Sequence, residues 1–197
     1  MKKYLLLLLV LALSFTTAFA ADENTIIIKT SKPVGTTVSL DAYTASKDEA
    51  FIVDWGDGEE KTYNVDPDGW GYSRRIKTEI KGGTITIKGK LVNFDLTEAG
   101  ITSVDLHGQT AMKVINLKKN EIATFKQDGM PALEELNLRD NKLTTFSGTG
   151  MTSLNKLNLQ GNQLDSYEFD ITDASATLTE LNVSDNGDKF INLNLMP

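Results

Sequence analysis

Apolar residues recur with one fixed spacing through the second half of the chain. Four segments share the pattern apolar-x-x-apolar-x-apolar-x-x-Asn, and they begin at Met112, Leu133, Leu154 and Leu178. The first three starts are 21 residues apart, and the last step is 24. A further copy begins at Leu91 and keeps the spacing, but it lacks the asparagine. Repetition at this period predicts a solenoid in which each coil stacks on the next.

The second and third apolar positions of each copy alternate with polar residues, as in a short strand with one buried face. Parallel stacking of such strands buries an apolar column that no single coil could bury alone. The asparagine that ends the pattern lies where the chain turns inward, and its amide can bond backbone groups that the turn leaves unpaired. We therefore predict a structural role for these four side chains: Asn120, Asn141, Asn162 and Asn186.

Another apolar position follows each copy, and we expect it to fill the inside of the coil. Its members are Val104, Phe125, Phe146 and Tyr167. The segments that return behind the sheet, such as 126–131 and 147–152, are rich in residues that form helices poorly. We expect extended or 3₁₀ backing, so that the solenoid is mostly strand and loop. Residues 190–195 alternate apolar and polar, which predicts a last strand that covers the open end.

The repeat resembles the leucine-rich-repeat family over about residues 91 to 191. The resemblance implies a mainly β protein, with a right-handed solenoid of about five short coils and a parallel sheet on its concave face. Bacterial surface proteins with short leucine-rich coils are similar. Because repeats of this kind carry many functions, the binding site must be argued separately from the fold.

Residues 24–90 have a different pattern, with β-branched segments between turn residues. Segments 25–28, 37–40, 51–55 and 84–87 are typical of strands in an antiparallel β domain. After 51–55, the sequence Gly-Asp-Gly at 56–58 predicts a tight hairpin into a segment at 61–65, because glycine allows positive φ.

The hairpin sequence Trp55-Gly56-Asp57-Gly58 and the later segment Gly82-Gly83-Thr84-Ile85-Thr86-Ile87 resemble the signature of PKD-type β-sandwiches. The His-Thr-Tyr-like element of that family is replaced here by Lys77-Thr78-Glu79-Ile80, so the resemblance implies a shortened, PKD-like domain. No linker separates this domain from the repeats, because Lys88-Gly89-Lys90 leads directly into Leu91. We expect the domain to cap the first coil.

The chain begins with the three-part layout of a secretory signal. Lys2 and Lys3 precede an apolar run from Tyr4, and the segment ends Ala18-Phe19-Ala20. The run has ten residues before Ser14, whereas a spanning helix needs roughly 20. We therefore expect no membrane span and a periplasmic, cell-surface or secreted protein. The expected organisation is a signal peptide at 1–20, a PKD-like domain at 21–90 and a leucine-rich-repeat domain at 91–197.

Composition narrows the possible functions. Removal of the signal leaves 18 basic residues against 27 acidic ones, a net charge of −9, which repels nucleic acid. The absence of cysteine excludes disulfides and thiol chemistry, and His107 is the only histidine, which excludes a catalytic triad or a histidine cluster. We expect a monomer without cofactor or metal that is not an enzyme.

Two groups of carboxylates are candidates for chemistry. The acidic segment around the hairpin is dense enough for calcium, which takes six to eight oxygen ligands, but its spacing matches no EF-hand loop, and turn formation explains it better. Its members are Asp54, Asp57, Glu59, Glu60, Asp66 and Asp68. Glu134 and Glu135 form a carboxylate pair of the kind glycosidases use. Both fall on one short strand at the sheet surface, which does not favour catalysis.

The outer face of the repeat sheet carries the first candidate ligand site. One column runs along the coils through Asp95, Asn116, Asn137, Asn158 and Asn182. The next column contains Thr97, Lys118, Arg139, Gln160 and Ser184. Its neighbour contains Glu98, Lys119, Asp140, Gly161 and Asp185. Lys118, Lys119 and Arg139 form one basic spot, which we expect to matter most for an anionic ligand. The candidate ligand residues are Asn116, Lys118, Asn137, Arg139 and Asn158; the alternative is a solvated sheet whose amides bond one another.

An aromatic group in the front domain is the second candidate ligand site. Trp70 and Tyr72, with Tyr43 or Tyr63, could form a platform for a sugar ring. Aromatic residues of strands more often pack in cores or across strands. A platform here would place the site in the front domain and not on the repeats.

Three functions remain open. The leading hypothesis is an exported, non-catalytic binding or adhesion module that recognises a protein or a glycan through the concave sheet, the front domain, or both. The alternative is a structural component of the cell envelope without a dedicated ligand. A glycan-active enzyme is third.

We predict that the mature protein begins at Ala21, because small residues at Ala18 and Ala20 flank Phe19 in the cleavage pattern. Mass spectrometry of the exported protein should find this N-terminus. A protein that retains residues 1–20 would contradict the argument for export.

Overall fold

The structure is a computed structural model of the chain, and it describes residues 24–66, 72–127, 129–165, 169–174 and 176–187. Several sequence predictions lie outside the described residues. They concern the signal segment 1–20, the aromatic Trp70, the filling residue Tyr167 and the closing strand at 190–195.

The front part of the molecule contains six strands, and the four that the sequence predicted are present. The predicted hairpin joins the third and fourth of them. The strands are β1 (Thr25–Thr30), β2 (Thr37–Tyr43), β3 (Ala50–Asp54), β4 (Glu60–Asn64), β5 (Ser73–Glu79) and β6 (Thr84–Lys88). The sequence analysis missed β5, because Ile76 is its one buried residue and its other side chains are polar.

The repeats form a β-solenoid with a period of about 21 residues, as predicted. Each copy of the pattern supplies one short strand, and these strands pair in parallel at equivalent positions, so the solenoid makes about four turns. The strands are β7 (Asn93–Asp95), β9 (Val114–Asn116), β10 (Glu135–Asn137), β12 (Lys156–Asn158) and β14 (Glu180–Asn182).

The returning side of the solenoid is extended or 3₁₀ where it is regular, which confirms the expected backing. Glycine and proline in these segments leave only short regular pieces. They are β8 (Ile101–Asp105), β11 (Phe146–Ser147), β13 (Phe169–Asp170) and the 3₁₀ turn η2 (Thr172–Ala174).

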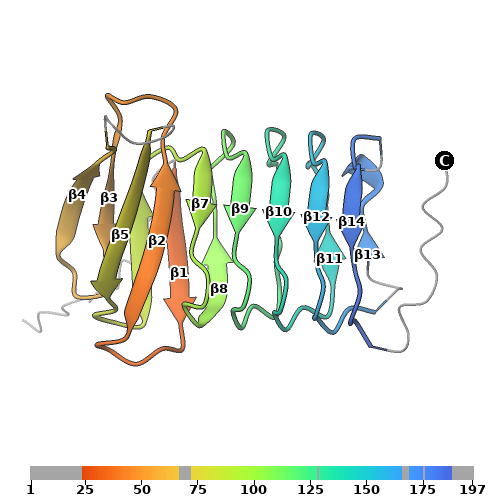
Figure 1. Cartoon of the computed structure of the whole chain (residues 1–197), viewed down its shortest axis with the longest axis horizontal. Helices are drawn as coiled ribbons and strands as arrows, with labels where there is room; N and C mark the ends of the chain where they lie inside the picture. The colour runs from red at the N-terminus through yellow and green to blue at the C-terminus, as the bar shows by residue number, and fades with distance from the viewer. Residues whose placement is uncertain (1–23, 67–71, 128, 166–168, 175, 188–197) are drawn as a thin grey trace, which may run out of the picture.

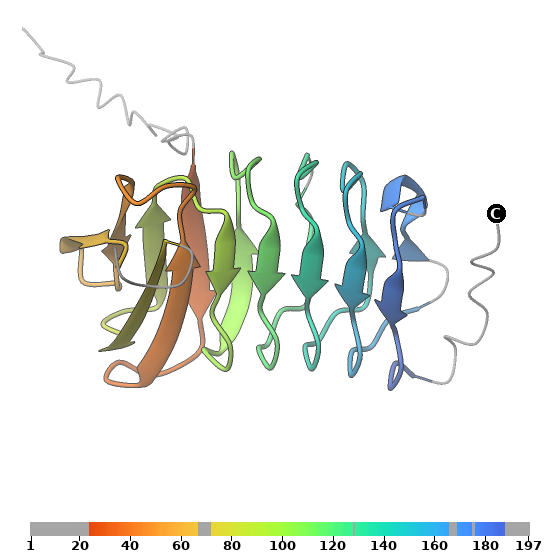
Figure 2. The ribbon, with the colours of Figure 1, turned by 45° about the horizontal axis from the view of Figure 1, so that its top comes forward.

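The two parts of the chain share their sheets. One sheet has seven strands in the order β14-β12-β10-β9-β7-β2-β5, and the other has five in the order β4-β3-β6-β1-β8. Strand β2 of the front part pairs antiparallel with β7 of the first coil, and β1 pairs antiparallel with β8. Figures 1 and 2 show the front strands and the coils as one elongated body. The front part therefore caps the solenoid by extending both of its layers.

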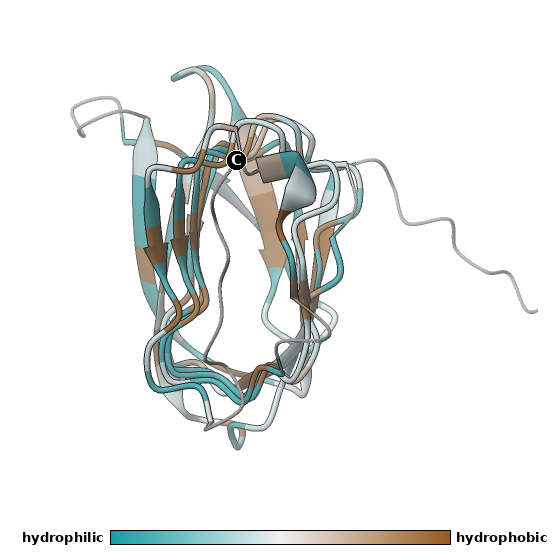
Figure 3. Cartoon of the chain, turned by 90° about the vertical axis from the view of Figure 1, so that its right-hand side faces the viewer, coloured by the Kyte–Doolittle hydropathy of each residue, from teal (hydrophilic) through white to brown (hydrophobic). Residues whose placement is uncertain are grey.

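One hydrophobic core runs through the whole molecule. The strands form two walls around it, as the view along the solenoid axis in Figure 3 shows. Ile26 and Ile28 of the front part belong to the same core as Leu136 and Leu157 of the repeats. The filling positions behave as expected where they are described, since Val104, Phe125 and Phe146 are all buried.

A buried glutamine joins the front part to the first coil. Gln109 is 1% exposed; its Oε1 accepts a hydrogen bond from the Leu91 amide at 3.2 Å, and its Nε2 donates to the Gly89 carbonyl at 2.9 Å. Gln127 repeats the arrangement one coil later with the amide of Leu106 and the carbonyl of Val104. These bonds satisfy backbone groups where the front part meets the first coil and where the first coil meets the second.

The repeated asparagines bond the backbone of two coils at once. The Oδ1 of Asn120 accepts hydrogen bonds from the amides of Ala99 and Ile101, each at 3.0 Å. Its Nδ2 donates to the carbonyls of Leu96 in the preceding coil and Leu117 in its own coil, each at 2.9 Å. The same bonds to an upstream amide and to carbonyls of both coils are made by Asn141, Asn162 and Asn186.

The residue before each structural asparagine has left-handed backbone geometry. Its φ lies at 56° in Lys119, 54° in Asp140 and 57° in Asp185, and Glu98 in the first coil is similar at 59°. Gly161 occupies the same position with a φ of 69°. The predicted column that contains Lys119 and Asp140 is thus the turn of each coil and lies beyond the end of each strand.

The front hairpin depends on the close approach of two glycines. Gly56 has a φ of 110°, and a Cβ on it would lie 2.5 Å from the backbone of Gly82. Asp54 of the acidic segment stabilises the turn, because its carboxylate accepts hydrogen bonds from the amides of Gly56 and Gly58. The segments that contain Gly56 and Gly82 therefore pack directly against each other.

Replacement of Asn141 by alanine should lower the free energy of unfolding by about 1–3 kcal/mol, because buried amide and carbonyl groups of two coils lose their partner. Asn137→Ala is the matched control. Its Oδ1 accepts one exposed amide, that of Arg139, and the loss should stay within about 0.5 kcal/mol. Chemical denaturation of both variants measures the difference, and equal losses would contradict the bridging role of Asn141.

Gly56→Ala should destabilise the front part strongly, since the new methyl group collides with rigid backbone and the φ is unfavourable for alanine. Gly58→Ala has a similar φ of 81° and open space around it, so it tests the dihedral alone. Thermal melts should rank wild type above Gly58→Ala and Gly58→Ala above Gly56→Ala. Equal melting temperatures for the two variants would show that the close approach is unimportant.

Candidate functional site on the seven-stranded sheet

The solvent face of the seven-stranded sheet carries two rows of side chains that run along the solenoid. In each coil the middle residue of the strand points into the core and its two neighbours point outward, as the alternation of a strand requires. The amide row consists of Asp95, Asn116, Asn137, Asn158 and Asn182. The leading row consists of Asn93, Val114, Glu135, Lys156 and Glu180.

Strand register continues both rows into the front part. Tyr43 lies opposite Asn93, and Asp41 lies opposite Asp95. On the far side of β2, Arg75 of β5 lies opposite Asp41. The face is therefore a single surface built by both parts of the chain, which the sequence analysis treated as separate candidates.

A groove of about 910 Å³ follows these rows from β5 to β14. Tyr43, Asp41 and Arg75 line its front end, and Thr179 and Glu180 line its far end. The amide row lies along its length. Of the candidate ligand residues, the structure brings Asn116, Asn137 and Asn158 together in this groove.

The amides in the middle of the groove keep their donors toward solvent. The Oδ1 of Asn137 accepts the amide of Arg139, and the Oδ1 of Asn158 accepts the amide of Gln160, each at 3.1 Å. Among the described residues, no protein group accepts a hydrogen bond from the Nδ2 of Asn137 or Asn158. The alternative of a ladder of amides that bond one another does not form at these two positions.

The charges at the groove are mostly paired with each other. Arg75 donates to both carboxylate oxygens of Asp41, at 2.7 and 2.9 Å. The Nζ of Lys156 lies 3.0 Å from Glu135, and the hydrogen bond and charge of that carboxylate raise the pKa of Lys156 above its ordinary value. The Oδ2 of Asp95 accepts the Nδ2 of Asn116 at 2.7 Å.

The expected basic spot lies beside the groove and is largely neutralised. Lys119 pairs with Glu98 at 2.6 Å, and this contact lowers the pKa of the Glu98 carboxyl. The Nε of Arg139 lies 3.1 Å from Asp140. Lys118 is half-buried, and neither it nor Arg139 belongs to the lining of the groove. The two cations therefore lie next to the groove and outside its lining.

The described aromatic candidates of the front part lie in different surroundings. Tyr63 is buried, stacks on Phe51 with ring centroids 5.8 Å apart, and its hydroxyl accepts the Nε1 of Trp55 at 3.2 Å, so it is a core residue. Tyr72 is 43% exposed and its carbonyl accepts the amide of Thr44. Of these candidates, Tyr43 lines the groove.

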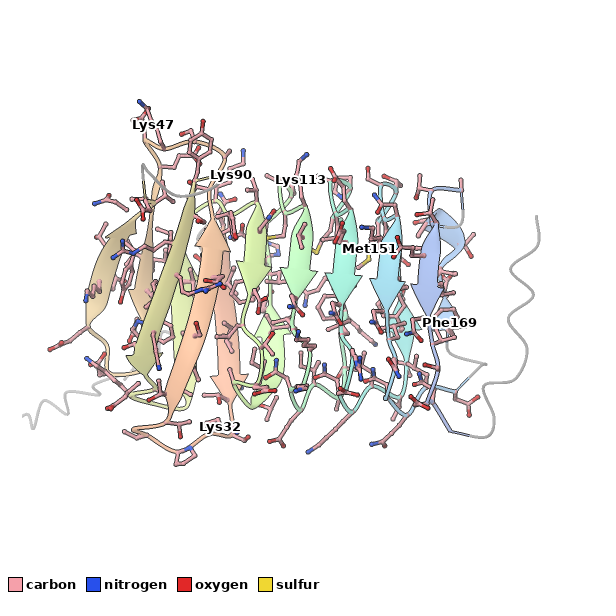
Figure 4. The ribbon with its side chains drawn as sticks, in the orientation of Figure 1. Lys32, Lys47, Lys90, Lys113, Met151 and Phe169 are labelled. Atoms are coloured by element: carbon pink, nitrogen blue, oxygen red, sulfur yellow. The ribbon has the colours of Figure 1, made fainter. Side chains whose placement is uncertain are left out.

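The carboxylates suggested for catalysis or calcium have other partners. Glu134 pairs with Lys113 at 3.0 Å, and Figure 4 shows Lys113 above the start of β9, whereas the neighbouring Glu135 pairs with Lys156. In the hairpin, Asp57 pairs with Lys81. Within the described parts of the chain, no group of three or more acidic or histidine side chains is arranged to hold a metal ion. The same parts contain no helix long and apolar enough to cross a membrane.

The sequence analysis missed the contributions of Lys156, Asp41 and Arg75 to this site. The repeat could have predicted the place of Lys156, since Lys156 occupies the position of Glu135 one repeat later. No sequence pattern could have predicted the place of Asp41 and Arg75 beside the amide row, because it depends on the pairing of β2 with β5 and β7.

Comparison with known proteins supports the repeat assignment. Residues 126–164 match a family model for leucine-rich repeats, and residues 174–187 match a second one. No curated protein and no solved structure matches the chain. The matched segments contain β10, β12 and β14 of the seven-stranded sheet. The chain thus contains a leucine-rich-repeat region preceded by a region of antiparallel β-sheet, and repeats of this family are typical of protein-interaction modules.

Proposed function

We propose that this protein is an exported, non-catalytic binding module that holds an extended protein or glycan ligand in the groove of the seven-stranded sheet. The observation that carries the proposal is the groove itself, which spans both parts of the chain and is lined by polar side chains with donors toward solvent. The leucine-rich repeats support an interaction function, and the first twenty residues support export.

The environment of the carboxylates in the groove favours binding over catalysis. A glycosidase uses a pair of carboxyl groups that flank the bond to be cleaved. Glu135 is paired with Lys156 and Asp41 with Arg75, so each of these carboxylates already bonds a cation of the protein. Both groups are therefore suited to hold the geometry of the surface.

The shared sheet also favours a dedicated ligand over a purely structural role. The front part closes the end of the core, which any solenoid needs. It additionally places Tyr43 and Asp41 in line with the rows of the repeats. The PKD-like domain suggested by the sequence thus contributes to the proposed binding surface through β2 and β5.

Protein and glycan arrays probed with the mature chain test this function. Asn116→Arg combined with Asn158→Arg should abolish the array signal, because two bulky cations fill the groove without changing the core. The melting temperature should change little, since both positions lie on the solvent face of the sheet and outside the hydrophobic core.

Two control variants locate the site. Lys118→Glu with Arg139→Glu changes the basic spot beside the groove, and Tyr72→Ala removes the exposed aromatic residue of the front part. Both should leave the array signal intact. A signal that survives the groove variant and disappears in either control would move the site away from the groove, and a mature chain without any signal would favour the structural alternative.

A further inference from the structure

We propose that the ligand of the groove is a linear, uncharged glycan that lies along the solenoid axis with one sugar ring on each coil. This inference rests on the proposed binding function and specifies its ligand class. Three features of the groove support the inference. One side chain, asparagine, repeats along the groove; its amide groups can bond hydroxyls; and most charged side chains of the groove are paired with one another.

The amide row repeats one side chain at a constant step. Asn116, Asn137 and Asn158 are partners in the parallel register, so neighbouring amides are separated by the strand spacing of about 4.8 Å. Identical groups at identical steps suit a ligand that is itself periodic along its length. A ring in an extended glycan advances by nearly the same distance, whereas a polypeptide presents a different side chain at every position.

The groups in the groove match the hydroxyls of a sugar. An amide both donates and accepts hydrogen bonds, as a hydroxyl does. The Nδ2 donors of Asn137 and Asn158 find no acceptor among the described residues, and each would supply one bond to a ring on its coil. At the front end Tyr43 adds a partly exposed aromatic ring, which offers an apolar face to the C–H groups of a terminal sugar.

The charges of the groove favour an uncharged chain. Asp41 with Arg75 and Glu135 with Lys156 already form ion pairs, at 2.7 and 3.0 Å. An ionic ligand would have to break these pairs, and an anionic one would also approach the carboxylates of Asp95 and Glu180. A neutral glycan leaves the pairs in place and uses the amides between them.

Isothermal titration calorimetry of the full mature chain tests the proposal. The probes are soluble β-1,4-linked gluco-, manno-, xylo- and N-acetylglucosamine oligosaccharides, each from the disaccharide to the hexasaccharide. We expect one series to bind, with an affinity that rises with each added ring and levels off once the rings reach the number of coils beside the groove. The affinity should be insensitive to salt, because no ion pair forms with the ligand.

Two asparagine variants give a matched comparison. Asn158→Ala should weaken binding of the longer oligosaccharides about fivefold, the effect of one lost hydrogen bond. Asn155→Ala removes the same side chain from the same coil at a position outside the groove lining, and it should leave binding unchanged. Circular dichroism should show the same fold for both variants.

Each contrary result has a distinct meaning. An affinity independent of oligosaccharide length would overturn the arrangement of one ring per coil, and stronger binding of polygalacturonate than of every neutral series would overturn the uncharged ligand. If no glycan binds while a protein signal on the arrays still depends on Asn116 and Asn158, the glycan is wrong and the groove is a protein site. If no signal of either kind depends on these residues, the proposed function fails as well.

Discussion

The fold depends on one interaction that is repeated in every complete coil, the bond network of a buried asparagine. A coil of about 21 residues has to turn sharply, and the turn leaves amides and carbonyls without strand partners. One side-chain amide satisfies groups of its own coil and of the coil before it, so it fixes both the turn and the stacking. In a chain without cysteine, this network and the apolar column inside it hold the coils together.

The surface chemistry follows from that stacking. Because each asparagine fixes the register between neighbouring coils, equivalent residues of successive strands lie side by side, and polar positions become straight rows. The groove exists only because the coils are aligned, since its lining comes from successive strands and no single coil supplies it. Ion pairs between residues one repeat apart, such as Lys142 with Glu121, also join neighbouring coils, although exposed pairs contribute little to stability.

The repeats were readable from the sequence because their information is local and periodic. The spacing around Asn141 predicts the strand, the turn and the buried amide without knowledge of any other part of the chain. The front part was readable only where apolar residues alternate, so β5 was missed. The place of Tyr43 beside Asn93 and the bonds of Gln109 across the junction arise from pairings between segments far apart, which no local pattern encodes.

The change from antiparallel to parallel pairing at β7 separates two kinds of growth. The front strands pair antiparallel, mostly with strands distant in the sequence, whereas beyond β7 each strand of this sheet pairs only with the coil before and after it. Duplication of a 21-residue unit between Asn141 and Asn162 would add one strand without disturbing either end. In evolutionary terms the length of the proposed binding face can change by whole repeats, whereas its front end at β2 and β5 stays the same.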